Sequence, residues 1–295
     1  MHELDIVILG HFAKDIIIVG DKKETSSGGS VYYGSVPLKK MGLEVGIITK
    51  LSENDFSRLY ELTDLGVAIH AISSNETSGI ENSYFSENRE ERKCKPIGFA
   101  GKFTIDDIHP NLTAKYFIIG PIMAGEVDLP LLNELHEKFP NKLCLDVQGF
   151  VRIRKNNDLI FEDWNEKAEG LKLITILKAD RAEIEVLTGI SDIELAVKEL
   201  SRFGPKEILI THENGASVLA SGEFFQFPWK NKSLEGRTGR GDTCFASYVG
   251  KRISSNPKES LKFSTALTSL KMEEPGPFKR EISNVNALIE KEYQT

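Results

Sequence analysis

Short apolar segments of strand length alternate with amphipathic segments of helix length along most of this chain. Many of the apolar segments are apolar at consecutive positions, which is typical of strands buried on both faces of a sheet. This alternation favours a parallel sheet covered by helices. The expected strands span residues 5–10, 45–51, 115–120, 142–147, 172–178 and 207–212, and the expected helices span 53–65, 128–138, 160–170, 180–188 and 192–203.

The last third of the chain changes in character, because strand patterns give way to successive helix patterns. The strand patterns lie near residues 216–220 and 223–228, and the helix patterns lie near 241–254, 257–273 and 283–291. The chain is therefore expected to end in helices rather than in further strand–helix units.

Residues 67–100 depart from the alternation, because they contain consecutive strand patterns with no helix between them. Asn88-Arg89-Glu90 is the expected turn within this segment. A further strand pattern, at 15–19, directly follows the first strand. We expect these pieces to form a small β layer beside the α/β body, where it would act as a lid over a crevice. The alternative is that these strands only extend the main sheet.

Composition and charge disfavour several classes of protein. The 295 residues carry a net charge of −7, which argues against a protein that coats nucleic acid or an anionic membrane. No apolar run approaches the roughly 20 residues of a membrane span, and the acidic start differs from a basic secretory signal. Three separated cysteines without a CxxC pair indicate a reducing compartment, and scattered histidines disfavour a transition-metal site. We therefore expect a cytoplasmic protein without nucleic-acid or membrane partners.

The stretch EGRTGRGDTCFASYVGKRI, residues 235–253, places three glycines before a helical pattern. A dinucleotide fingerprint should follow the first strand, and here the third glycine of that motif is replaced by Cys244. The tripeptide Arg240-Gly241-Asp242 also occurs in extracellular adhesion loops, but here it runs directly into the helical pattern. Both of these interpretations are therefore disfavoured.

The same stretch favours a phosphate-binding loop. Glycines let backbone N–H groups approach a ligand closely, and a helix start presents unpaired N–H groups and a positive dipole end. Asp242 stands at this helix start. It could cap the helix, or it could act as the general base that takes the proton from an attacking hydroxyl. The pattern alone leaves both roles open.

This stretch resembles the C-terminal signature of the ribokinase-like (PfkB) carbohydrate kinases, a D-T-x-G-A-G-D motif followed by a helix. Gly239, Gly241 and Asp242 match the signature, whereas Arg240 replaces the usual alanine and Gly236-Arg237 replace Asp-Thr. The resemblance implies an anion hole formed by the backbone of residues 239–242, with Asp242 as the catalytic base.

Further motifs of that family follow in order along most of the chain. For the acceptor, the resemblance implies contacts from Asp15, from the glycine pair Gly28 and Gly29, and from Gln148 and Arg152 in LDVQGFVR. Tyr33 stands where the family usually has Asn, which implies an altered pocket. For the donor, it implies roles for Asp180 and Glu183 in the element tied to magnesium and phosphate, for Thr211 and Gly215 in the nucleotide segment, and for Thr265 beside the adenine.

The resemblance implies a single ribokinase-like domain over residues 1–295. Its fold would be a three-layer α/β/α sandwich with a mostly parallel sheet and a small β lid from about 11–35 and 67–102. The chain, a monomer or homodimer, would use ATP and Mg²⁺ to phosphorylate a small polyol or sugar, with myo-inositol the favoured acceptor because LDVQGFVR and TGRGD look most like that branch. Kinases of ribose, nucleosides or 2-keto-3-deoxygluconate remain alternatives, as does a non-catalytic sugar- or nucleotide-binding regulator.

Overall fold

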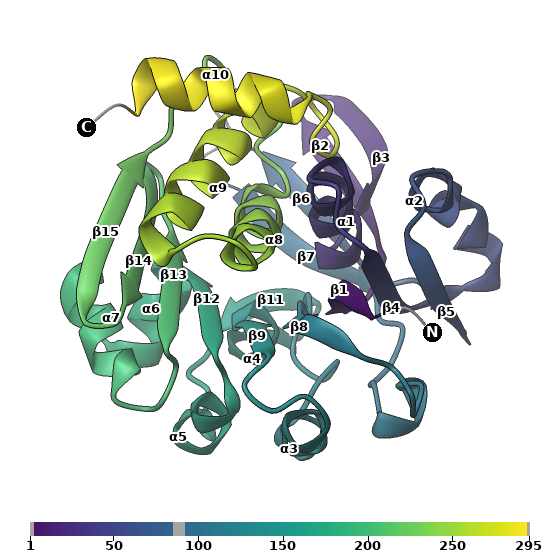
Figure 1. Ribbon diagram of the computed structural model, residues 1–295. Coiled ribbons are helices and arrows are strands. Elements are labelled where there is room, and N and C mark those ends of the chain that lie inside the picture. The colour runs from purple at the N-terminus through teal and green to yellow at the C-terminus, as the bar shows by residue number, and fades with distance from the viewer. Residues whose placement is uncertain (1–2, 85–91, 294–295) are drawn as a thin grey trace.

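A nine-stranded sheet forms the centre of the computed structural model, which describes residues 3–84 and 92–293 (Figure 1). The expected turn at Asn88-Arg89-Glu90 lies outside the described residues. The strand order is β15-β14-β13-β12-β9-β8-β1-β4-β5, parallel from β13 to β5 and antiparallel at β14 and β15. The strands are β1 (Leu4–Leu9), β4 (Val45–Ser52), β5 (Ala68–Ser74), β8 (Ala114–Ile119), β9 (Leu143–Asp146), β12 (Ile176–Asp180), β13 (Glu207–Thr211), β14 (Gly215–Ala220) and β15 (Glu223–Pro228).

Helices cover both faces of this sheet, so the three-layer prediction is confirmed (Figure 1). One face carries α1 (Ser30–Lys40), α8 (Arg240–Arg252) and α9 (Pro257–Met272), with α10 (Ile282–Glu292) packed against α9; the other carries α3 (Leu129–Lys138), α5 (Lys167–Gly170), α6 (Arg181–Thr188) and α7 (Ile193–Ser201). In β1, Ile6 and Ile8 join the first core, while Val7 and Leu9 join the second. Burial on both faces explains why apolar residues are consecutive in these strands.

A separate four-stranded sheet stands beside the body, in the order β3-β2-β6-β7. It consists of β2 (Ala13–Val19), β3 (Lys22–Gly28), β6 (Gly79–Tyr84) and β7 (Arg92–Gly98). Because β2 pairs in parallel with β6, the two pieces expected from the sequence do lie side by side. However, β5 pairs with β4 in the main sheet and α1 packs on the body. The small sheet is therefore narrower than the expected ranges 11–35 and 67–102, and its role as a lid stays a prediction.

Two sequence expectations are wrong in part. Residues 158–161 form β11 (Asp158–Phe161), which pairs with β10 (Arg152–Lys155), so the helix expected over 160–170 is reduced to α5. Asn156 and Asn157 make the tight turn with φ of 49° and 66°, a region that Asn tolerates better than most residues. The strand expected at 172–178 lies later, at β12, after the single turn η3 (Leu171–Leu173).

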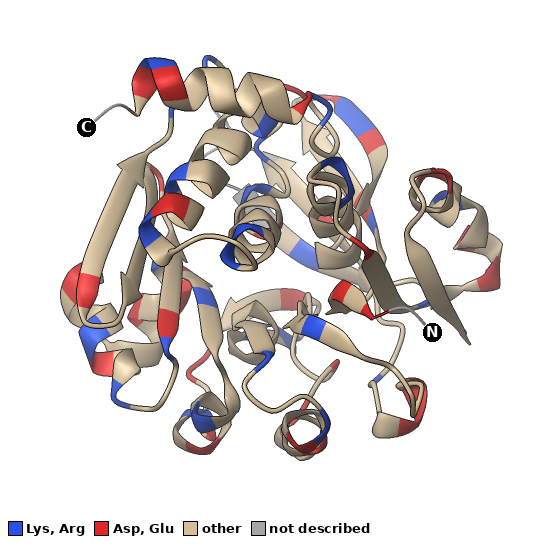
Figure 2. Ribbon diagram, viewed as in Figure 1, with Lys and Arg blue, Asp and Glu red and all other residues tan. Residues whose placement is uncertain are grey.

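The remaining short helices connect these elements. They are η1 (Glu53–Leu59), α2 (Tyr60–Asp64), η2 (Ile105–Asp107) and α4 (Gln148–Val151). Basic and acidic residues are interspersed along the outer helices and the small sheet (Figure 2). Within the described residues, no helix is both long enough and apolar enough to cross a membrane.

Candidate active site

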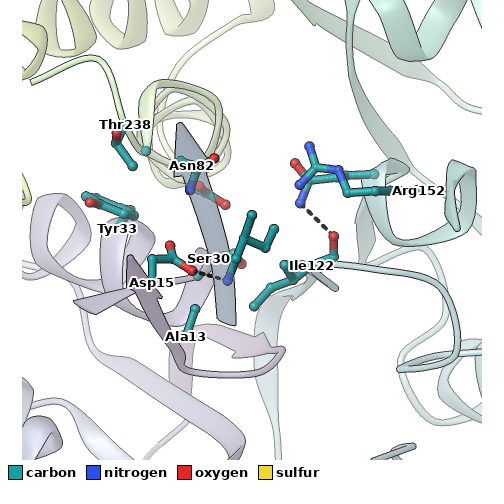
Figure 3. A pocket seen from close by; sticks show the side chains of 14 residues that line it. Ala13, Asp15, Ser30, Tyr33, Asn82, Ile122, Arg152 and Thr238 are labelled. Carbon is teal, nitrogen blue, oxygen red and sulfur yellow. Dashed lines mark hydrogen bonds between the residues drawn. The ribbon is translucent and has the colours of Figure 1, made fainter. Parts of the chain in front are cut away.

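Two cavities open where the parallel strands end at their carboxyl edge. The first, which we name the polar cavity, measures about 70 Å³ and is lined by Asp15, Ser30 and Asn82 among others (Figure 3). The second, the basic cavity, measures about 90 Å³. Both include Gln148, Arg152, Gly239 and Asp242 in their linings. The two cavities therefore meet at the glycine turn that the sequence singled out.

Asp15 and the glycine pair are packed tightly at one wall of the polar cavity. The Asp15 carboxylate accepts a hydrogen bond from the Ile80 N–H at 2.8 Å, which joins β2 to β6 (Figure 3). A Cβ on Gly28 would lie 2.4 Å from Asp15 Oδ2, and a Cβ on Gly29, whose φ is +84°, would lie 2.4 Å from the His11 carbonyl oxygen. Both glycines are required by close approach, since no side chain fits.

The opposite wall of the polar cavity carries Arg152 and Gln148. In Figure 3, Arg152 projects toward the cavity from the side facing Asp15 and Tyr33. Gln148 Nε2 donates to the Ile122 carbonyl at 3.1 Å, which fixes the orientation of its amide. The structure thus brings together every residue for which the sequence predicted an acceptor contact, except that Gly28 supports Asp15 instead of lining the cavity.

Tyr33 packs against the glycine turn. A Cβ on Gly239 would lie 2.3 Å from the Tyr33 ring, and Gly239 has φ +80° at the N-cap of α8. Thr243 Oγ1 donates to the Tyr33 carbonyl at 3.4 Å. Tyr33 therefore does not simply replace a polar contact of the family, because it also shapes the turn that joins the two cavities.

Asp242 lies in the first turn of α8 rather than at the cap position, which Gly239 occupies. Asp242 lines both cavities. Burial raises the pKa of Asp242 to about 6, and the Asp146 carboxylate adds to the rise, while Lys178 and Arg152 oppose it. A carboxylate between two cavities, with a pKa close to neutral, suits proton transfer better than helix capping.

The basic cavity contains four cationic side chains. They are Arg152, Lys178, Arg237 and Arg240, and they come from β10, β12, the turn before α8 and the start of α8. Thr211 and Asp180 also line this cavity, at the ends of β13 and β12. Such a cluster beside a helix N-terminus favours an anion with several charges. It gives a location to Arg237 and Arg240, two of the three departures from the family signature.

Lys178 is a functional candidate that the sequence motifs did not indicate. It is 3% exposed within β12, and its ammonium lies 3.0 Å from the Asp146 carboxylate and 3.5 Å from Glu183 Oε2. A Cβ on Gly241 would lie 3.3 Å from Lys178 Nζ. Burial alone would lower the pKa of Lys178, but Asp146 and Glu183 raise it above its ordinary range. The signal in the sequence was a single lysine within an otherwise apolar buried strand.

Asp180 and Glu183 form a capping box at the start of α6. Asp180 Oδ1 accepts from the Glu183 N–H at 2.9 Å, and Glu183 Oε2 accepts from the Asp180 N–H at 2.7 Å. Glu183 is fully buried, and burial raises its pKa to about 8. Asp180 is therefore the N-cap of α6, and Glu183 completes the capping box as its N3 residue.

The fit of this region to Mg²⁺ rests on one oxygen. Within residues 3–84 and 92–293, no cluster of three or more His, Cys, Asp or Glu is arranged to bind a metal. Glu183 Oε1, however, is buried without a hydrogen-bond partner. Since protein-bound Mg²⁺ usually keeps several waters, such an oxygen suits a metal-bound water. The residues fit an ion held through water, and the metal role of Glu183 stays a prediction.

Two residues expected at the nucleotide lie outside both cavities. Gly215 begins β14, where a Cβ would lie 2.2 Å from the Phe227 carbonyl oxygen of β15. Thr265 is fully buried in α9 and donates to the Leu261 carbonyl at 2.7 Å. Their surroundings favour structural roles, so the nucleotide contacts stay predictions. Asn82 was not expected, although it lies on β6 at 4% exposure and lines the polar cavity.

The fold and the paired cavities suit a small-molecule phosphotransferase, and comparison with solved structures shows this class. A pyrophosphate-dependent kinase in the ribokinase family, complexed with a pyrophosphate analog and myo-inositol, is 34% identical with a TM-score of 0.88, over 96% of this chain and 99% of that one. A related structure, which concerns conversion of a pyrophosphate-dependent myo-inositol-1 kinase into a myo-inositol-3 kinase, is 33% identical with a TM-score of 0.88, over 98% and 100%. The chain belongs to the ribokinase (PfkB) family and is a kinase that transfers phosphate to a hydroxyl acceptor.

More distant relatives agree on the fold. Arabidopsis thaliana ribokinase, complexed with ribose and ATP, has a TM-score of 0.76 at 18% identity, over 98% of this chain and 99% of that one. A cytidine kinase from Thermococcus kodakarensis is 26% identical over 266 residues, 87% of this chain and 91% of that protein. No family model matches the chain.

Proposed function

We propose that this kinase transfers a phosphoryl group from pyrophosphate to a hydroxyl of myo-inositol. The observation that carries the proposal is that Asp242 lines the polar cavity and the basic cavity at once. A hydroxyl in the first cavity and a phosphate in the second would meet beside this carboxylate. The two kinases at 33–34% identity, which are described with pyrophosphate and myo-inositol, support the choice of both substrates.

Pyrophosphate is favoured over ATP by the lining of the basic cavity, in which four cationic side chains outnumber the carboxylates of Asp146, Asp180 and Asp242. Arg240 lies 5.8 Å from the Trp229 ring, and Trp229 Nε1 donates to the His212 carbonyl directly after Thr211. The arrangement suits a compact, highly charged anion better than a nucleotide, so ATP, the donor that the family resemblance implies, becomes the second candidate.

The acceptor would bind through side chains that form hydrogen bonds with hydroxyl groups. Asp15 can accept hydrogen bonds, Arg152 can donate them, and the amides of Asn82 and Gln148 can do both. A polyol with a hydroxyl on each ring carbon matches this mixed set. The small sheet contributes Asp15 and Asn82, so movement of this sheet would open and close the cavity.

In the reaction, ionised Asp242 would take the proton of the attacking hydroxyl. The hydroxyl oxygen would bond to the nearer phosphorus, the bridging P–O bond would break, and inorganic phosphate would leave. Lys178 and the backbone amides of Gly241 and Asp242 would stabilise the transferring group. The Arg240 amide is left out of this set, because it already donates to the Arg237 carbonyl at 3.1 Å. Mg²⁺, held through water near Glu183, would neutralise charge on the donor.

The pH dependence of the rate follows from Asp242. A general base must be ionised in order to accept a proton. The pKa of Asp242, about 6, lies above its ordinary value, so the fraction of enzyme with an ionised Asp242 falls as the pH drops through 6. We expect kcat/KM to decrease about tenfold per pH unit below this value. The profile is measured with pyrophosphate and with a slow donor analogue. A profile that stays flat down to pH 5 would argue that another group is the base.

The donor is tested by comparing pyrophosphate with ATP at equal Mg²⁺, with myo-inositol as acceptor and phosphorylated product as readout. We expect kcat/KM to be higher with pyrophosphate. In Arg240→Ala, KM for pyrophosphate should rise about tenfold or more, since a hydrogen bond to a charged group contributes about 1.5–3 kcal/mol. Turnover with ATP and none with pyrophosphate would reverse the donor assignment.

Cytidine is the second acceptor candidate, since a curated relative at 26% identity is a cytidine kinase. The same assay is run with myo-inositol, cytidine, ribose and 2-keto-3-deoxygluconate, with each donor. Preference for cytidine would replace the acceptor while leaving the family and the role of Asp242 in place. The regulator considered from the sequence is not proposed, because the relatives at 33–34% identity are kinases.

A further inference from the structure

Lys271, near the end of α9, is a buried lysine that the reaction described above does not use. Its side chain is 1% exposed. Its ammonium donates hydrogen bonds to the backbone carbonyl oxygens of Gly236 and Thr238. It also lies 4.8 Å from the centre of the Tyr33 ring. The charge of Lys271 is thus held by two carbonyl oxygens and an aromatic face.

The two carbonyl groups belong to the turn that starts the phosphate-binding helix. Gly236 and Thr238 flank Arg237, which lines the basic cavity, and Gly239 follows as the N-cap of α8. Gly236 is pressed against the end of α9, because a Cβ there would lie 1.9 Å from the Glu274 carbonyl oxygen. Its N–H donates to the Met272 carbonyl at 2.8 Å. This close contact explains the glycine at position 236 and brings the turn within reach of Lys271.

Carbonyl oxygens that converge on one positive charge are also the means by which proteins hold a monovalent metal ion. In this chain the charge is carried by a side chain of α9, so the cation cannot diffuse away from the turn, and the charge is lost only by deprotonation as the pH rises through about 7. Burial lowers the pKa of Lys271 to about 7, and attraction by Asp242 opposes the lowering. The same attraction lowers the pKa of Asp242, which keeps the base ionised. The ammonium therefore acts on the shape of the turn and on the charge state of the base.

We propose that Lys271 is a built-in monovalent cation, a positioning residue that holds the turn of residues 236–239 in its anion-binding shape. The ammonium bridges the Gly236 and Thr238 carbonyls, as a monovalent metal ion bound between them would. As a consequence, the wild-type kinase works without any added monovalent cation. The proposal rests on the proposed function only for the choice of assay substrates.

Chemical rescue gives the decisive activity test. Lys271→Ala removes the charge and leaves a space beside the two carbonyls, and we expect kcat to fall about 10–100-fold, as for other supporting residues around a bound cation. Potassium or ammonium chloride should restore much of the loss, whereas choline chloride at equal ionic strength should not. Lys271→Met, which fills the space without a charge, should stay slow in every salt. A folded Lys271→Ala that keeps wild-type kcat, or that no cation rescues, overturns the proposal.

A matched control and a wild-type measurement complete this test. Lys258, on the exposed surface of the same helix, is replaced by Ala as a control for the loss of a lysine, and its kcat should be unchanged in every salt. The wild-type rate should be the same in potassium and in choline chloride. Stimulation of the wild type by potassium of several-fold overturns the proposal, even if Lys271→Ala does not fold.

A binding measurement separates this inference from the proposed function, because it needs no turnover. Crystals of Lys271→Ala grown or soaked in a thallium(I) salt should show an anomalous peak between the Gly236 and Thr238 carbonyl oxygens. Wild-type crystals treated in the same way should show none there. If the peak appears but no donor and acceptor pair is turned over, the proposed function is rejected and the built-in cation is retained. If the enzyme turns over its substrates but neither the peak nor the rescue is found, the built-in cation is rejected and the proposed function is retained.

Discussion

Replacing Asp242 by Asn should lower kcat by about 10²–10⁴, because the amide cannot take the proton of the attacking hydroxyl. The variant should remain folded. Folding raises the pKa of Asp242 from 3.8 to about 6. At a pH above 6 the ionised carboxylate therefore lowers the free energy of unfolding of the wild type. The amide does not have this cost, and the melting temperature at pH 8 should therefore be equal to or higher than that of the wild type.

The measurement combines steady-state kinetics with thermal melting at pH 8. Asp192→Asn serves as the matched control, since Asp192 is the exposed N-cap of α7 and Asn caps helices equally well. It should change neither kcat nor melting temperature appreciably. Near-normal turnover in Asp242→Asn would remove the base from the mechanism and would also remove the reason for a rate decrease below pH 6.

Replacing Lys178 by Met should impair both stability and rate. The change keeps the chain length but leaves the Asp146 and Glu183 carboxyl groups buried without their shared cation. Removing one partner of a buried ion pair costs about 3–5 kcal/mol of unfolding free energy. Loss of a preorganised positive charge beside the transferring phosphate should lower kcat by about 10²–10³.

A second substitution separates the two effects of Lys178. The double variant Lys178→Met, Glu183→Gln lacks one of the two uncompensated carboxyl groups. Its free energy of unfolding should therefore be higher than that of Lys178→Met alone, while its kcat should remain low. Lys172→Met, at an exposed lysine just before the same strand, is the control. If the double variant regained both stability and rate, Lys178 would have only a structural role.

Much of the fold could be predicted because it depends on local patterns. Consecutive apolar residues marked the strands buried on both faces, and β1, β4, β8, β9 and β13 lie where that pattern placed them. The hairpin of β10 and β11 was not predicted. Its turn depends on Asn156 and Asn157 with positive φ, and the helix expected over 160–170 overlapped the last two residues of β11.

The candidate site could be predicted only where a short sequence motif determines the local backbone conformation. Glycines directly before a helical pattern indicate a tight turn, and Gly239 is the N-cap of α8 with Asp242 in the first helical turn. Lys178 and Lys271 have no local motif. Each is a buried lysine, and each has a partner from a distant segment: Asp146 lies 32 positions from Lys178, and Gly236 lies 35 positions from Lys271.

The sequence alone was enough to predict the layered α/β fold, the resemblance to the ribokinase family and the position of Asp242, the proposed base, after the glycine turn. Three further features depend on tertiary structure: Asp242 lines two cavities, four cationic side chains line the second cavity, and the Lys271 ammonium donates to two carbonyls of the turn. The physical reason is that periodicity and turn chemistry act over a few residues, whereas burial of charge depends on which distant segments supply the compensating groups.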